Sequence, residues 1–98
     1  MLQGTTPTHR FKLPFDTERV AEARVIYKQR GETVLTKTME DFDMDGQWLS
    51  LKLSQEETFL FRLENVTYQL RVKDVSGTAL ATKPKTISVT ECLEKEVI

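Results

Sequence analysis

Cysteine, histidine and tryptophan each occur once in this sequence, and long apolar runs are missing. Because Cys92 is the only cysteine, no disulfide can form within the chain, which favours a reducing compartment. No segment approaches the roughly 18 apolar residues of a membrane-spanning helix. The first residues lack the basic segment and apolar run of a secretory signal. We therefore expect neither secretion by the usual route nor membrane insertion.

Motifs that assemble catalytic or metal-binding sites are also missing. The sequence has no glycine-rich phosphate loop, no G-x-S-x-G turn, no H-E-x-x-H and no Cys/His spacing that suits a metal. Cys92 would need a neighbouring base to act as a nucleophile, and no pattern places His9 beside it. We expect a protein that is not an enzyme and binds no cofactor. A small hydrolase stays a third hypothesis.

Neither sign of charge is in excess. The chain has 14 Lys and Arg residues against 15 Asp and Glu residues, a formal net charge of −1, and the two signs are interspersed along the sequence. Nucleic-acid-binding domains normally carry a basic excess or a basic stripe. We therefore expect no nucleic-acid partner, and the balance gives no electrostatic preference for any other one.

Strict alternation of apolar and polar residues is the strongest pattern that is present. It is clearest from Val66 to Lys73. Successive side chains of a strand point to opposite faces, so alternation indicates one buried and one solvated face. We predict that one set faces the core and the other lies outside, namely Val66, Tyr68, Leu70 and Val72 inside, and Thr67, Gln69, Arg71 and Lys73 outside.

Six further segments have strand-like character, which makes about seven short strands in all. Gly31, Gly46 and Gly77 each separate two segments and mark tight turns. Pro14 places the first segment at a sheet edge or a strand end. Short strands with regular turn signals predict an all-β fold, an antiparallel, immunoglobulin-like β-sandwich. The other segments are Phe11–Phe15, Ala21–Lys28, Thr33–Thr38, Trp48–Leu53, Phe59–Leu63 and Thr86–Thr90.

Two segments also have helical signals. Thr17–Gly31 can be interpreted as a helix that Thr17 caps and Gly31 ends, but Val25–Ile26–Tyr27 favours a strand. We favour a strand over Glu22–Arg30, with one face formed by Ala21, Ala23, Val25 and Tyr27. The pattern Ser54–Gln55–Glu56–Glu57 is a capping box and predicts one helical turn between Leu53 and Phe59.

The segment Asp41–Gly46 has carboxylates at alternate positions before a glycine, as at the start of an EF-hand calcium loop. The position of the closing bidentate glutamate is taken by Lys52, and the flanking segments are strand-like. We predict that Asp41, Asp43 and Asp45 form no strong calcium site but the acidic tip of a hairpin with an Asp-Gly turn. Weak cation binding stays open.

The length fits one domain over residues 1–98, with an N-terminal arm over residues 1–8 and a C-terminal tail over residues 94–98.

Trp48 lies on the strand face opposite Leu49, Leu51 and Leu53, so it faces solvent or covers the far face of its sheet. An isolated apolar group at such a position favours an interface. Val97 and Ile98 are the apolar residues at the end of a polar segment, which either docks on a neighbouring subunit or frays. The predicted interface residues are Trp48, Val97 and Ile98.

Three stretches together carry a resemblance over nearly the whole chain. They are residues 4–17, with Gly4–His9 and Phe11–Thr17, then Leu53–Thr58, and then Gln69–Val72 with Cys92–Leu93. The pattern resembles small uncharacterised proteins of phages and prophages of Gram-positive bacteria. The resemblance implies a structural or assembly protein of the virion, of the tail or baseplate, with no catalytic residues to carry over.

The expected function is accordingly a non-enzymatic structural or interaction module of a phage or prophage particle. Its partners would be other virion proteins or itself, with a possible homo-oligomer, and its location would be the virion, assembled in the bacterial cytoplasm. The alternative is a carbohydrate-binding or host-adhesion domain with Trp48 as its contact.

Overall fold

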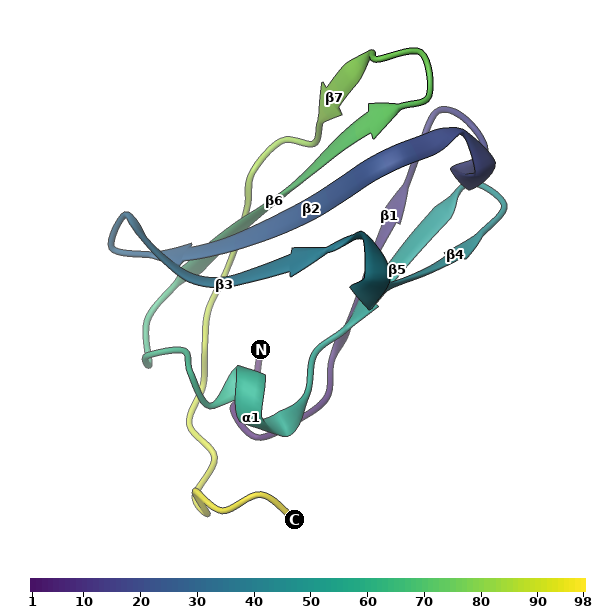
Figure 1. Cartoon of the computed structure of the whole chain (residues 1–98). Helices are drawn as coiled ribbons and strands as arrows, with labels where there is room; N and C mark the ends of the chain where they lie inside the picture. Colours follow the sequence, from purple (N-terminus) through teal and green to yellow (C-terminus); the bar gives the residue numbers. More distant parts are fainter.

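Two antiparallel sheets pack face to face and make the fold all-β (Figure 1). The computed structural model describes all residues, Met1–Ile98. The smaller sheet has the strand order β1-β5-β4, and the larger has the order β3-β2-β6-β7, with β8 also paired to β6. The strands are β1 (Thr8–Lys12), β2 (Val20–Gln29), β3 (Glu32–Thr38), β4 (Phe42–Asp45), β5 (Trp48–Lys52), β6 (Val66–Asp74), β7 (Ala79–Ala81) and β8 (Lys85–Ile87). The helical elements are η1 (Thr17–Arg19), η2 (Met39–Asp41) and α1 (Gln55–Thr58).

The alternation predicted for Val66–Lys73 is confirmed in β6. Its four apolar side chains are buried and the four polar ones between them are more exposed. The strand lies at the centre of the larger sheet, between β2 on one side and β7 and β8 on the other. Its inner face therefore contributes Val66, Tyr68, Leu70 and Val72 to a core of 16 buried apolar residues between the sheets.

The strand favoured for Glu22–Arg30 is confirmed, since β2 spans Val20–Gln29, while Thr17–Arg19 form the short 3-10 turn η1. Thr17 does not cap a helix, because Asp16 caps the short η1 turn and the Thr17 hydroxyl donates to the carbonyl of Gly46. The prediction that Ala21 shares one face with Ala23, Val25 and Tyr27 is wrong, because Ala21 is exposed and the other three are buried. A register shift between Val20 and Glu22 lies at this residue, so Val20 is buried in its place. A bulge of this kind changes which residues face the core, and sequence alternation does not reveal it.

The β2–β3 hairpin turns at Arg30 and Gly31, which have φ values of 52° and 75°. Gln29 pairs with Glu32 across this two-residue loop. Positive φ at both central residues defines a type I′ turn, whose twist suits a hairpin. The glycine therefore marks the turn for a conformational reason, as the sequence predicted.

The predicted strand Phe59–Leu63 is wrong, because these residues form irregular structure after α1. The N–H groups of Phe59 and Leu60 bond to carbonyls of the α1 turn, and Phe61 and Arg62 bond to side chains rather than to a neighbouring strand. The buried amide of Gln29 accepts from the backbone N–H of Arg62 and donates to the carbonyls of Arg62 and Glu64. Phe61 nevertheless enters the core.

The helical turn predicted between Leu53 and Phe59 is confirmed, since Ser54 and Glu57 form the capping box of α1.

Two short strands, β4 and β7, were missed by the sequence interpretation. Residues 42–45 were considered only as part of the acidic motif, and the small residues of β7 give no apolar alternation. The Asp-Gly turn was predicted correctly, because β4 and β5 form a hairpin around Gly46 and Gln47. β1 ends at Lys12, two residues before Pro14, and is an edge strand.

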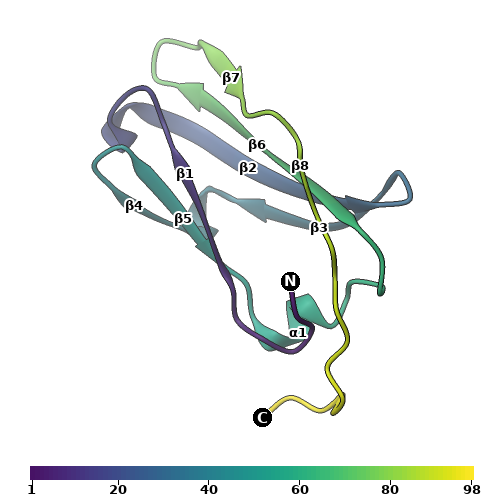
Figure 2. The same cartoon turned by 180° about the vertical axis from the view of Figure 1, so that it is seen from behind.

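The chain ends lie at the same end of the sandwich (Figures 1 and 2). Leu2 makes a parallel bridge to Thr90, and the amide of the buried Gln3 donates to the carbonyl of Phe61. The residues after Thr90 run past α1, where the backbone of Ile98 bonds twice to the side chain of Gln55. β7 lies at the opposite end of a molecule that is 46 Å long.

Candidate functional site

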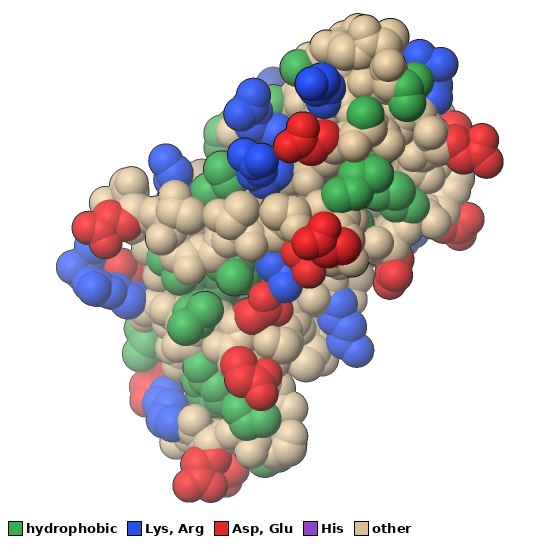
Figure 3. All heavy atoms as spheres, in the orientation of Figure 1, with side chains coloured by type: hydrophobic (Ala, Val, Ile, Leu, Met, Phe, Trp, Pro, Cys, Tyr) green, Lys and Arg blue, Asp and Glu red, His purple; other side chains and the backbone are tan.

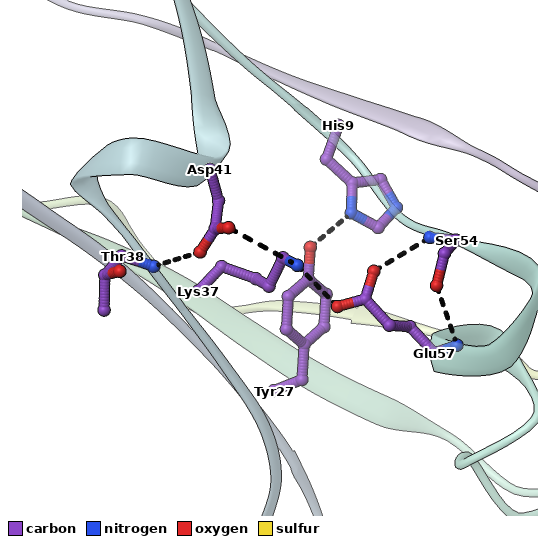
Figure 4. A network of polar contacts seen from close by, with 7 residues as sticks. All are labelled: His9, Tyr27, Lys37, Thr38, Asp41, Ser54 and Glu57. Carbon is purple, nitrogen blue, oxygen red and sulfur yellow. Dashed lines mark hydrogen bonds and ion pairs between the residues drawn. The ribbon is translucent and has the colours of Figure 1, made fainter.

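The sandwich has two lateral openings, where the edge strands of its sheets face each other. A polar network closes one of them (Figure 4). Lys37 of β3 donates to Glu57 of α1 and lies 3.8 Å from the carboxylate of Asp41. The side chains of Lys37 and Glu57 are 15% and 19% exposed, so water screens this pair only partly. The network therefore ties β3, η2 and α1 together on this side of the sandwich.

An aromatic cluster lies next to this network (Figure 4). The His9 ring stacks on Tyr68 with a centroid separation of 4.8 Å, and its Nδ1 lies 2.6 Å from the hydroxyl of Tyr27. Burial lowers the pKa of His9, aided by the positive N-terminus and Lys85, and burial raises the pKa of Tyr27. A neutral imidazole and a protonated phenol are thereby favoured, with Tyr27 donating to Nδ1 and the imidazole proton on Nε2.

The pKa of Glu57 is also displaced. Burial by itself favours the protonated carboxyl, but hydrogen bonds from Lys37 and Ser54 outweigh burial, and the pKa of Glu57 is lowered. The carboxylate stays charged and holds the lysine. Tyr27 is fully buried and His9 is half-buried, so this cluster stabilises the contact between the sheets.

The other opening contains an apolar groove between the end of β1 and β7. Its volume is about 210 Å³, and five of its eight lining residues are hydrophobic. Leu80 is 39% exposed, although it belongs to a short strand that packs on the sandwich. Water therefore reaches apolar surface at this groove. The groove is lined by Lys12, Leu13, Pro14, Leu70, Val72, Leu80, Ala81 and Thr82.

Free backbone groups flank this groove. Pro7 pairs with Leu53 and Leu13 with Gln47 through backbone hydrogen bonds at the two ends of the β1–β5 ladder. Hydrogen-bonded pairs alternate in an antiparallel ladder, so the intervening N–H and C=O groups of β1 point away from β5. They belong to Thr8, Arg10 and Lys12. β1 therefore presents an unpaired strand edge beside the groove.

The outer face of the larger sheet concentrates basic side chains, although the two signs are mixed in the sequence (Figure 3). A hollow of about 240 Å³ on this face is lined by Arg24, Arg71 and Lys73 with a single acidic residue, Glu22. The cross-strand pair of Arg24 and Arg71 brings together residues that are far apart in the chain. The charge pattern of the surface therefore differs from that of the sequence.

Trp48 lies on the outer face of the smaller sheet and is 36% exposed. The guanidinium carbon of Arg10 is 4.3 Å from the centre of its ring. This cation–π contact covers one face of the indole. Trp48 begins β5 at the β4–β5 hairpin, whereas Val97 and Ile98 lie beyond α1, so the structure does not bring the three predicted interface residues together (Figure 1).

The segment Glu91–Ile98 contains the most exposed apolar side chains of the molecule. Leu93 is 98% exposed and Ile98 is 94% exposed, while Val97 is 46% exposed. Few contacts hold the segment to the body. Besides the bonds to Gln55, Lys95 donates to Gln3. Leu93 was not among the predicted interface residues. The available signal was an apolar residue within a charged segment near the end of the sequence.

The acidic motif is divided between two elements. Asp41 ends η2, where its carboxylate accepts from the backbone N–H of Thr38, and Asp43 and Asp45 are exposed on β4. No three His, Cys, Asp or Glu side chains of the structure are grouped closely enough to hold a metal ion. The absence of a strong calcium site stays a prediction, and weak cation binding stays open.

Sequence reasoning also missed the groove, since its residues come from three separate strands. Pro14 was the one available signal, because it indicated an edge strand at this place.

The only α-helix has four residues, and no helix is long and apolar enough to cross a membrane. Comparisons with family models, with curated proteins and with solved structures found no match to this chain.

Proposed function

We propose that this domain is a non-enzymatic structural and interaction module of a phage or prophage particle, and that it acts in tail or baseplate assembly. The observation that carries the proposal is the apolar groove beside the unpaired edge of β1. Strand edges and exposed apolar grooves are the features by which β domains add strands from partners. The resemblance to small phage proteins supplies the biological setting.

The finer fold that we propose is immunoglobulin-like. If β1, β5 and β4 are strands B, E and D, and β3, β2, β6 and β7 with β8 are strands C′, C, F and G, both sheet orders agree with that fold. In this assignment the place of strand A beside strand B is empty. That place is the free edge of β1, so the fold assignment supports an interaction role for the same edge.

The partners would be other virion proteins or further copies of the chain, in a virion assembled in the bacterial cytoplasm. The test is co-expression with the products of neighbouring genes, followed by affinity purification and light scattering. We expect a stable complex with an identified structural protein, or self-assembly. A protein that stays monomeric, captures no structural protein and turns over a small molecule would contradict the proposal.

The alternative, a carbohydrate-binding or host-adhesion domain, depends on the exposed ring of Trp48. Arg10 covers one face of this ring, so only the other is free to stack on a sugar. A glycan-binding measurement on the wild type and on Trp48→Ala distinguishes the two functions. Glycan binding that Trp48→Ala abolishes would favour the alternative.

A further inference from the structure

We propose that the groove between β1 and β7 binds the segment Glu91–Ile98 of a second copy of this chain, which adds as a strand to the free edge of β1. The inference rests on the proposed function as an interaction module and names the partner. Four features carry it: the groove, the alternation within the segment, the charges at the edge, and the positions of groove and segment in the molecule.

The groove requires a strand with apolar side chains on one face. A strand added beside β1 would bond to the free backbone groups of Thr8, Arg10 and Lys12. Its inward side chains would lie over Leu13, Val72 and Leu80, which line the groove. Its outward side chains would lie opposite the exposed side chains of Arg10 and Lys12.

Within the segment Glu91–Ile98, the part Leu93–Val97 fits such a strand. In an extended conformation Leu93, Lys95 and Val97 share one face and Glu94 and Glu96 share the other. Glu91 falls on the first face, and Cys92 and Ile98 fall on the second. Leu93 and Val97 lie four residues apart, with Lys95 between them, whose long side chain can hold its amine at the rim of the groove. Leu93 is almost fully exposed in the isolated chain, so docking would remove apolar surface from water on both partners.

The charges select this segment among possible strands. Lysine at a sheet edge discourages pairing with a strand that lacks a counter-charge. Glu94 and Glu96 would face Arg10 and Lys12, and opposite charges directly across a strand pair stabilise the pairing. The segment therefore supplies at its outward positions the sign of charge that the edge lacks.

The positions of the two parts identify the partner as a second copy. The groove lies at β7, and Glu91–Ile98 lies beyond α1 at the other end of the long axis (Figures 1 and 2). Each copy thus carries a donor segment at one end and an acceptor groove at the other. A contact of this kind builds rings or filaments, or a two-fold dimer in which two antiparallel copies exchange their segments.

The test measures self-association of the full chain by light scattering over a concentration series. We expect assembly in the wild type that weakens as salt is added, because exposed charge pairs are screened. Leu93→Ser, Lys12→Glu, and the pair Glu94→Lys with Glu96→Lys should each reduce association at least tenfold. Combining Lys12→Glu with Glu94→Lys and Glu96→Lys restores opposite charges and should recover part of it.

Matched controls keep the test specific. Leu63→Ser removes another exposed leucine, and Lys28→Glu reverses an exposed lysine on the outer face of the other sheet. Neither should change association. A peptide with the sequence of residues 91–98 should compete with assembly, and a peptide of the same composition in which the leucine and the valine are adjacent should not.

The outcomes separate this inference from the proposed function. Assembly that none of the groove or segment variants changes would overturn the inference and leave the proposed function standing. The same holds for a monomer that binds an identified virion protein. A monomer without any such partner would overturn both. Circular dichroism of each variant checks folding, and Leu93→Ser gives the clearest result because Leu93 packs on nothing in the single chain.

Discussion

At the residue scale, the core is organised around aromatic rings that join the two sheets. Tyr68 of β6 stacks on Tyr27 of β2 and on His9 of β1, with centroid separations of 5.3 and 4.8 Å. Phe11 adds an edge contact to Tyr68. Because these residues belong to both sheets, the cluster fixes the sheets relative to each other as well as filling space.

Replacement of Tyr68 by alanine should lower the free energy of unfolding by about 3–5 kcal/mol, because the ring is buried and the space it leaves cannot fully collapse. Denaturant unfolding followed by circular dichroism measures the change. Lys73→Ala, at an exposed position of the same strand, should change the stability by less than about 0.5 kcal/mol. Equal effects of the two changes would show that the inward and outward faces of β6 are assigned wrongly.

At the element scale, two glycines with nearly the same φ have different surroundings. Gly31 turns the β2–β3 hairpin with φ 75°, and Gly4 has φ 74°. A Cβ at Gly31 would have no atom within 4 Å, whereas a Cβ at Gly4 would lie 2.6 Å from Cζ of Phe59. The turn before β1 is thus packed tightly on the segment after α1.

Gly31→Ala should therefore cost about 1–2 kcal/mol, the penalty of a side chain in the left-handed region. Gly4→Ala should cost about 1–3 kcal/mol more, since the methyl group must also displace the ring of Phe59. Comparing the unfolding free energies of the two variants isolates the packing contribution. If both variants lose the same stability, the ring moves away freely and the proposed packing is wrong.

The β4–β5 hairpin gives a second prediction at this scale. We expect no strong calcium binding at Asp41, Asp43 and Asp45, because Lys52 stands at the closing position and Asp41 is engaged by η2. Calorimetric titration with calcium, together with thermal melting, is the measurement. Tight binding that is lost in Asp43→Asn would refute this prediction.

At the scale of the whole molecule, polar contacts between elements make stability depend on pH. The pKa of His9 is lowered in the folded protein from its usual 6.5, mainly by burial. The unfolded chain therefore binds a proton at His9 more readily, and stability falls as the pH drops below about 6.5. The lowered pKa of Glu57 adds a second loss as the pH falls below its usual value of 4.5.

His9→Gln should flatten the first part of this pH dependence, and Glu57→Gln should flatten only the second. Melting temperatures measured from neutral to acidic pH for the wild type and both variants provide the check. The comparison uses slopes with pH, so a constant loss of stability in either variant does not matter. An unchanged slope below pH 6.5 in His9→Gln would show that another group is responsible.

The sequence alone determined the features that depend on local physics. Alternation in β6, the Asp-Gly turn before β5, the tight turn at Gly31 and the capping box at Ser54 all follow from preferences of a few adjacent residues. Such preferences act within a strand or a turn and are therefore visible in the order of residues. They were sufficient for the all-β class with two packed sheets.

Only the tertiary structure decided the features that depend on distant residues. The bulge at Ala21 follows from the pairing of β2 with β6, and the backbone of Phe59–Leu63 finds its partners in the α1 turn and in the side chains of Gln3 and Gln29 rather than in a strand. The groove unites Leu13 with Leu80, and the basic face unites Arg24 with Arg71. Each depends on which strands become neighbours, and that is set by the packing of the whole core and not by any local preference.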